Sequence, residues 1–239
     1  MSDPPEHLVK SYDQELKRLR SLMTQMGGIV ETQVALAADA IMQRDTVSAM
    51  RAVEQDPHVD ALEREVENFA IRLLALRQPV AGDLREIVAA LKITGDLERI
   101  GDYAANVAKR SIVLAQFQLP YSLGGLVHMA RLVQGQLKSI IDALGDNDTE
   151  KAVEVWRSDQ VVDDIYNALF RELITYMMED PRNITPCTHL LFIAKNLERI
   201  GDHATNIAEN LYYAVKGELL PDTRPKGDNS AYAVIRSPA

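Results

Sequence analysis

Four pairs of acidic side chains, each pair spaced four residues apart, are the candidates for chemistry in this sequence. The pairs are Asp56 and Asp60, Glu98 and Asp102, Asp159 and Asp163, and Glu198 and Asp202. On an α-helix, residues at this spacing lie about 40° apart, so each pair would share one face. Carboxylate oxygens suit hard or borderline cations such as Mg²⁺, Mn²⁺, Ca²⁺ and iron. The spacing therefore indicates cation ligands, although acids on one helix face more often form its solvated side.

The acid pairs recur because the chain contains an internal duplication. Residues 97–108 read LERIGDYAANVA and residues 197–208 read LERIGDHATNIA, with nine of twelve positions identical at an offset of 100. Upstream, Asp56 and Asp60 match Asp159 and Asp163 at an offset of 103. The repeat is too long for a solenoid, whose units span about 20–50 residues. Retention of the acids in both copies, while Tyr103 is matched by His203, favours a shared role for them.

Packing of neighbouring helices would bring the acids of each copy together. We call Asp56, Asp60, Glu98 and Asp102 the first acid quartet, and Asp159, Asp163, Glu198 and Asp202 the second acid quartet. We expect both on an outer flank of the protein, opposite the apolar stripes. Like charges at this spacing destabilise a helix by about 0.2–0.5 kcal/mol, so we expect compensation by cations. Candidate further contacts to a metal ion or phosphate are Arg99, Asn106, Arg199, His203 and Asn206.

No other motif predicts catalytic residues. The inward-facing Glu-x-x-His motifs of di-iron bundles are missing from the sequence, and so are the glycine-rich phosphate-binding motifs. The single cysteine, Cys187, rules out an intramolecular disulfide framework and is expected to be buried. We therefore expect no organic cofactor and only metal ions, among which Fe, Mn, Mg, Ca and Zn are not distinguished.

Composition limits the possible partners. The chain has 239 residues and a net charge of −9, which disfavours nucleic acid and anionic membrane surfaces as partners. The longest apolar runs are well short of the roughly 20 residues that cross a bilayer. The polar start, MSDPPEHLVK, lacks the apolar stretch of a signal peptide. We expect a cytoplasmic protein without membrane insertion.

Proline placement and apolar periodicity predict an all-α fold. Apolar residues recur at helical spacing in six long stretches, and aromatic residues make up only 5% of the chain. Asp45 is the expected N-cap of the second helix, Leu84 begins the buried stripe of the third, and Gly101 and Gly201 should allow close helix approach. The architecture expected is two tandem three-helix bundles related by duplication, with six antiparallel helices. The predicted units are residues 1–118, residues 119–217 and a flexible tail at 218–239.

The paired LERIGD motifs and their Asp-x-x-x-Asp partners resemble those of the PhoU family of phosphate-uptake regulators, over residues 8 to 216. The resemblance implies a cytoplasmic homodimer that restrains phosphate uptake and the phosphate-starvation response. It further implies an adapter role between the ATPase subunit of the phosphate ABC transporter and a sensor histidine kinase. Some members bind metal clusters through such acid pairs, which implies that the two quartets are the ligand sets here.

Two other functions remain open from the residues. A metal-dependent hydrolase acting on a phosphorylated substrate would need a general base and an enclosed cleft. A purely structural helical scaffold would need neither metal nor partner. Phosphate release in the presence of metal would favour the hydrolase, and capture of partners without turnover would favour the regulator.

Overall fold

The computed structural model describes residues 6–118 and 122–220, with side chains from Tyr12 onward. Over these residues the chain forms six long α-helices and no strand. The helices are α1 (Glu6–Gln43), α2 (Thr46–Arg77), α3 (Ala81–Leu114), α4 (Gly124–Asp146), α5 (Thr149–Glu179) and α6 (Ile184–Lys216), with a short 3₁₀ turn, η1 (Pro181–Asn183), before α6. The predicted all-α class and the six helices are confirmed. The predicted boundary at 118/119 and most of the predicted tail, from residue 221, fall at or beyond the edges of the described residues.

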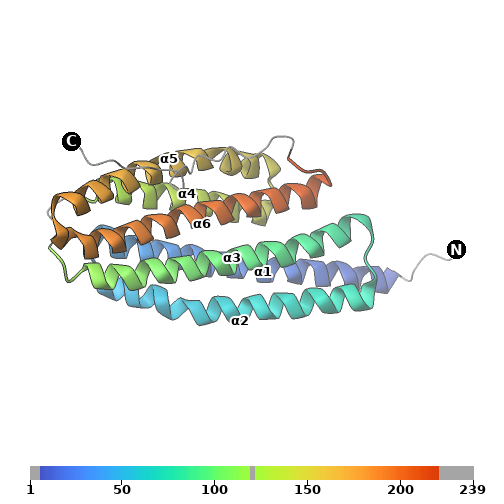
Figure 1. The fold of residues 1–239 in the computed structure, drawn as a ribbon. Helices are drawn as coiled ribbons and strands as arrows, with labels where there is room; N and C mark the ends of the chain where they lie inside the picture. Colours follow the sequence, from blue (N-terminus) through green and yellow to red (C-terminus); the bar gives the residue numbers. More distant parts are fainter. Residues whose placement is uncertain (1–5, 119–121, 221–239) are drawn as a thin grey trace.

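The six helices form two bundles of three that pack along α3 and α6. In Figure 1, α1, α2 and α3 make up one half of the molecule and α4, α5 and α6 the other, with α3 and α6 side by side at the centre. These two central helices run antiparallel, since Asp96 contacts His203 near the middle of α3 while Arg110 contacts Phe192 towards its end. The fully buried Leu97, Ile100, Leu197 and Ile200 belong to one continuous apolar core. The motifs that carry the acids are thus on the most enclosed helices of the fold.

Matching side chains begin the second helix of each bundle. The Asp45 carboxylate accepts a hydrogen bond from the Val47 amide at 2.9 Å, and Asp148 accepts from the Glu150 and Lys151 amides at 3.0 Å. These bonds satisfy amide groups that have no partner within the helix. The predicted N-cap at Asp45 is confirmed, and its counterpart at Asp148 keeps the same role in the second repeat.

One predicted core position is wrong. Leu84 is 41% exposed and does not join the buried stripe of α3. It lies near the turn between α2 and α3, where Leu76 and Val80 are also exposed. Side chains at the end of a long bundle have neighbours on fewer sides, so helical periodicity alone overestimates burial there.

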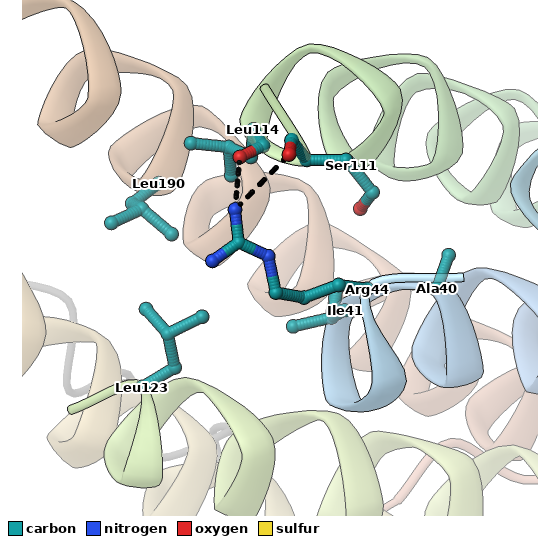
Figure 2. Close-up of a pocket in the computed structure, with 8 residues that line it drawn as sticks. Ala40, Ile41, Arg44, Ser111, Leu114, Leu123 and Leu190 are labelled. Carbon is teal, nitrogen blue, oxygen red and sulfur yellow. Dashed lines mark hydrogen bonds between the residues drawn. The ribbon is translucent and has the colours of Figure 1, made fainter. Parts of the chain in front are cut away.

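An arginine closes the junction where α1, α3, α4 and α6 meet. Arg44 has a left-handed backbone conformation, with φ of 55°, and its guanidinium donates to the Leu114 carbonyl at 2.9 Å and the Ala115 carbonyl at 3.3 Å (Figure 2). A cation at this position satisfies the last carbonyls of α3 and interacts well with the helix dipole. The cavity beside it measures about 20 Å³, lined mainly by apolar side chains. That volume holds about one water molecule, so this cavity is not a substrate site.

None of the described helices has the length and apolar character required to cross a membrane.

Candidate functional site

The first acid quartet comes together on the facing sides of α2 and α3. Burial, together with the carboxylates of Asp102 and Asp60, raises the pKa of Asp56. Burial also raises the pKa of Glu98, and Asp102 and Asp60 raise it further. Charges influence each other in this way only over short distances in a partly desolvated site. Asp60 and Asp102 thus lie near both Asp56 and Glu98, and the first quartet is a partly desolvated, negatively charged region between α2 and α3.

A fifth carboxylate, Glu63 on α2, joins this group. Burial raises the pKa of Glu63, as do the charges of Glu67 and Asp60, and Glu63 in turn raises the pKa of Glu98. The sequence interpretation did not assign Glu63 to the site, because its counterpart in the second repeat is Tyr166. Glu63 lies one turn after Asp60 on the same helix face, and this spacing could have indicated that it belongs to the site.

A buried amide supports the first quartet from α1. Gln33 is completely buried, and its Nε2 donates to the Asp56 carboxylate at 3.3 Å. Its Oε1 packs against Gly101 so closely that a Cβ at position 101 would lie only 3.0 Å from that oxygen. Gly101 thus allows the close helix approach that the sequence predicts. Gln33 itself was missed, although its match to Gln136 at the offset of 103 could have revealed it.

The arginines around the first quartet are exposed and make only long ion pairs with it. The Arg99 side chain is 59% exposed and lies 3.6 Å from Glu98 and 3.8 Å from Asp102. Arg64 lies 3.9 Å from Asp60 and is 68% exposed. Surface ion pairs of this kind contribute about 0–1 kcal/mol. The first quartet is therefore only weakly compensated by protein cations.

Three of the four acids of the second quartet are buried, contrary to the expectation of an outer flank, and Asp202 is half-buried. Asp159, Asp163 and Glu198 are only 2%, 4% and 4% exposed. Lys195 on α6 donates to Glu198 Oε1 at 2.8 Å, and its ammonium lies 4.9 Å from the centre of the Tyr166 ring. The expectation failed because each helix of a bundle packs against neighbours on more than one side, so the face opposite its main stripe is not always solvated.

The other predicted residues lie mostly between the two repeats rather than on the quartets. His203 Nδ1 is 2.8 Å from the Asp96 carboxylate, and Asn206 donates to the same carboxylate at 3.3 Å. Arg199 places its guanidinium over the Tyr103 ring, 5.5 Å from its centre. Asn106 is exposed. Arg99 lies beside the acids of its own repeat, and Asn206 lines an open groove together with Glu98 of the first quartet.

A solvent-accessible groove borders the first quartet. It has a volume of about 570 Å³ and is lined by Glu63, Glu98, Arg99 and Lys92 from the first repeat and by residues of α6. Among the described residues, no three His, Cys, Asp or Glu side chains already stand in an arrangement that would hold a metal ion. The donor chemistry of the first quartet still fits a hard cation, because it offers carboxylate oxygens, reduced hydration and weakly compensated negative charge. Metal binding stays a prediction.

Two matching three-helix repeats, each with an acid quartet, define an all-α tandem-repeat protein, and comparison with known proteins places it in a family. A family model described as the PhoU domain matches residues 23–111 and again residues 126–211. The chain belongs to the PhoU family.

Relatives resemble the chain over nearly its whole length. It is 53% identical over 224 residues to a Caulobacter vibrioides protein and 48% identical over 223 residues to a Rhizobium meliloti protein, covering 93% of this chain in both comparisons and 97% and 94% of those proteins. Both relatives are named phosphate-specific transport system accessory protein PhoU homolog.

Two solved structures share the fold. The crystal structure of PhoU from Pseudomonas aeruginosa superposes with a TM-score of 0.84 at 40% identity, over 87% of this chain and all of that chain. The structure of the phosphate transport system regulatory protein PhoU from Streptococcus pneumoniae gives 0.80 at 31% identity, over 87% of this chain and 99% of that chain. The recognition of the family from the LERIGD repeats is confirmed.

Proposed function

We propose that this chain is a cytoplasmic negative regulator of phosphate uptake and of the phosphate-starvation response. The observation that carries the proposal is the 53% identity, over 93% of the chain, to a protein named as an accessory protein of phosphate-specific transport. Similarity that covers both repeats supports transfer of the whole role rather than of one domain.

The proposed action is that of an adapter rather than an enzyme. Its partners would be the ATPase subunit of the phosphate ABC transporter and a phosphate-sensing histidine kinase, and the chain would act as a homodimer. Two packed bundles offer long, rigid helix faces suited to protein contacts. The groove beside the first quartet is open, and its residues include no histidine or serine that could act as a base or nucleophile.

We further propose that the first acid quartet holds a hard cation. Asp56, Asp60, Glu98 and Asp102 would supply the oxygen ligands, with Glu63 at the edge of the site. A bound cation supplies positive charge, which would neutralise the acidic groove and provide a place for an anion such as phosphate. The change in surface potential would alter which partner surface the groove attracts.

Gene replacement tests the regulatory role. Deletion of the gene should raise alkaline phosphatase expression and phosphate accumulation in phosphate-rich medium, and the intact gene should restore repression. Repression that persists in the deletion strain would overturn the proposal. Capture of the transporter ATPase and the histidine kinase by the tagged chain, without phosphate release from phosphorylated substrates, tests the adapter role; turnover without capture would favour a hydrolase.

Elemental analysis tests the cation site separately. The double variant Glu98→Ala and Asp102→Ala should lose bound metal, because two of the four ligands are removed. Glu54→Gln is the matched control: Glu54 is an exposed acid on α2, two residues before Asp56. Metal content that is unchanged in the double variant would remove these residues from the proposed ligand set.

A further inference from the structure

Duplication kept the acids of the two quartets but changed the residues around them. At the offset of 100, Lys195 in the second repeat stands where the first repeat has Gly95. At the offset of 103, Tyr166 stands where the first repeat has Glu63. Each of these two exchanges makes the surroundings of Glu198 more positive by one charge. Further along α6, Glu209 stands where the first repeat has the exposed Lys109, so the added charge is local to these two positions.

Lys195 is held in the second quartet by two contacts. Its Nζ is 2.8 Å from Glu198 Oε1, in a pair whose side chains are 30% and 5% exposed. The same ammonium lies over the face of Tyr166, at 4.9 Å from the ring centre, which is a favourable cation–π distance. A carboxylate buried to this degree requires an opposite charge or hydrogen bonds to remain ionised. The lysine provides that charge from within the chain.

Among the described residues, no lysine stands at the equivalent position in the first quartet, and Lys109, whose charge lowers the pKa of Asp56, is exposed. Position 95 carries no side chain, and a Cβ built there meets no heavy atom within 4 Å. Instead of a tyrosine ring, Glu63 adds a carboxylate beside Glu98. The nearest guanidinium, from Arg99, is 3.6 Å from Glu98 and largely in solvent.

We infer that Lys195 is a tethered counter-ion that occupies the cation position of the second quartet, so that the first quartet alone of the two binds an exchangeable cation. The ammonium in the second quartet is the observation that links such a group of acids to a positive ligand: the same residue types, in the duplicated position, are already paired with a cation. The inference rests in part on the proposed cation binding by the first quartet.

The only tryptophan of the chain offers a local probe of the second quartet. Trp156 lies on α5, one helical turn before Asp159, is 4% exposed, and donates to Glu209 at 2.9 Å. Terbium, a hard trivalent cation with a preference for oxygen ligands, becomes luminescent when a nearby excited tryptophan transfers energy to it. Because Glu209 also lines the groove beside the first quartet, the signal of the second quartet is the gain in tryptophan-sensitised emission of Lys195→Met over the wild type. Equilibrium dialysis counts all bound ions.

The test compares the metal-free full-length chain with Lys195→Met and Gly95→Lys. The wild-type chain should bind one terbium ion per chain, and its tryptophan-sensitised emission is the baseline. Lys195→Met should gain a second ion and sensitised emission, with affinity at the second quartet at least about tenfold higher than in the wild type. Gly95→Lys should lose the first ion, because the new ammonium would lie beside Glu98 as Lys195 lies beside Glu198.

The control variants separate charge from shape. Lys195→Arg keeps the positive charge and should gain neither an ion nor sensitised emission over the wild type. Gly95→Ala adds a side chain without charge and should keep the first ion. Asp164→Asn removes an exposed acid next to Asp163 and should change neither signal. Circular dichroism establishes that each variant is folded, and Lys195→Gln replaces Lys195→Met if the latter is not.

Each outcome decides between the inference and the proposed function. Two bound terbium ions in the wild type, or no gain of an ion and of sensitised emission in folded Lys195→Met and Lys195→Gln, would overturn the inference. A wild-type chain that binds no terbium, with a Lys195→Met variant that gains one sensitised ion, would support the tethered counter-ion and overturn cation binding by the first quartet.

Discussion

The two acid quartets have the same residue types at matching positions, yet they differ in solvation and charge. Asp159, Asp163 and Glu198 are buried with an internal lysine, whereas the Asp60 and Asp102 side chains are 48% and 42% exposed and have only exposed arginines nearby. The comparison teaches that retained acids do not by themselves define a site. The charge around each quartet also depends on residues that differ between the repeats: Gly95 against Lys195, and Glu63 against Tyr166.

The largest expected loss of stability comes from removing Lys195, and removing Arg99 from the first repeat is the comparison. Lys195→Met should lower the free energy of unfolding by on the order of 2 kcal/mol, less than the 3–5 kcal/mol of a fully buried pair because the lysine is 30% exposed. Arg99→Met should change it by less than about 0.5 kcal/mol, because that arginine is a surface partner. Urea denaturation of both variants without metal measures the difference. Equal losses would contradict the claim that only the second quartet is internally compensated.

Neutralising the matching glutamates, Glu98 and Glu198, should change the free energy of unfolding in opposite directions. Glu198→Gln should destabilise the metal-free chain by about 1–2 kcal/mol, because it leaves Lys195 without its charged partner. Glu98→Gln should stabilise the chain by less than about 1 kcal/mol, because burial and Asp102 already disfavour the charged form of Glu98. Thermal unfolding of the two variants beside the wild type provides the measurement. The same sign in both would show that the quartets are electrostatically alike.

Replacing either of two glycines of α3 by alanine should also change stability, in opposite directions at the two positions. Gly101→Ala should cost about 1 kcal/mol net, because its methyl group would press on the buried Gln33 oxygen at 3.0 Å and on Val59 at 3.3 Å. Gly95→Ala should add up to about 1 kcal/mol through helix propensity, since nothing lies within 4 Å of its Cβ. Denaturant midpoints of the two variants test this. A loss of stability at position 95 would mean that a lysine there is also sterically excluded.

The last prediction is the pH dependence that the first quartet adds to stability, a gradual effect spread over a range of pH. Because the pKa values of Asp56 and Glu98 are raised in the folded state, the unfolded chain releases these protons first as pH rises. Their ionisation therefore lowers the free energy of unfolding as pH rises from their ordinary values, 3.8 and 4.5, through the raised ones. The double variant Asp56→Asn and Glu98→Gln should exceed the wild type in stability at neutral pH, and the difference should fade as pH falls through this range. Urea titrations at a series of pH values, in the presence of a chelator, would contradict this if the difference were constant.

Much of the candidate site could be predicted because it depends on local spacing. Helical periodicity and the repeated LERIGD motif are properties of contiguous residues, so they identified the six helices, the duplication and the family. The grouping of Asp56 and Asp60 with Glu98 and Asp102 followed from two such faces on adjacent helices. Gln33 was missed because it comes from α1, and nothing in the spacing of the acids indicates which residue of a third helix faces them.

The burial of the second quartet could not be read from spacing. Periodicity identifies the main apolar stripe of a helix, but whether the opposite face is solvated depends on how many neighbours surround that helix. Asp159 and Glu198 look like solvated acids in the sequence, and Leu84 looks like a core residue, yet the packed bundle reverses both.

By itself the sequence determined the helical class, the two repeats, the family and the identities of the acids, because each of these is written in residue types at fixed distances along the chain. Only the tertiary structure decided which acids are buried and which cation accompanies them. Desolvation and charge pairing depend on all the helices that surround a side chain, and Lys195 and Glu63 acquire their effect on the quartets through that three-dimensional packing.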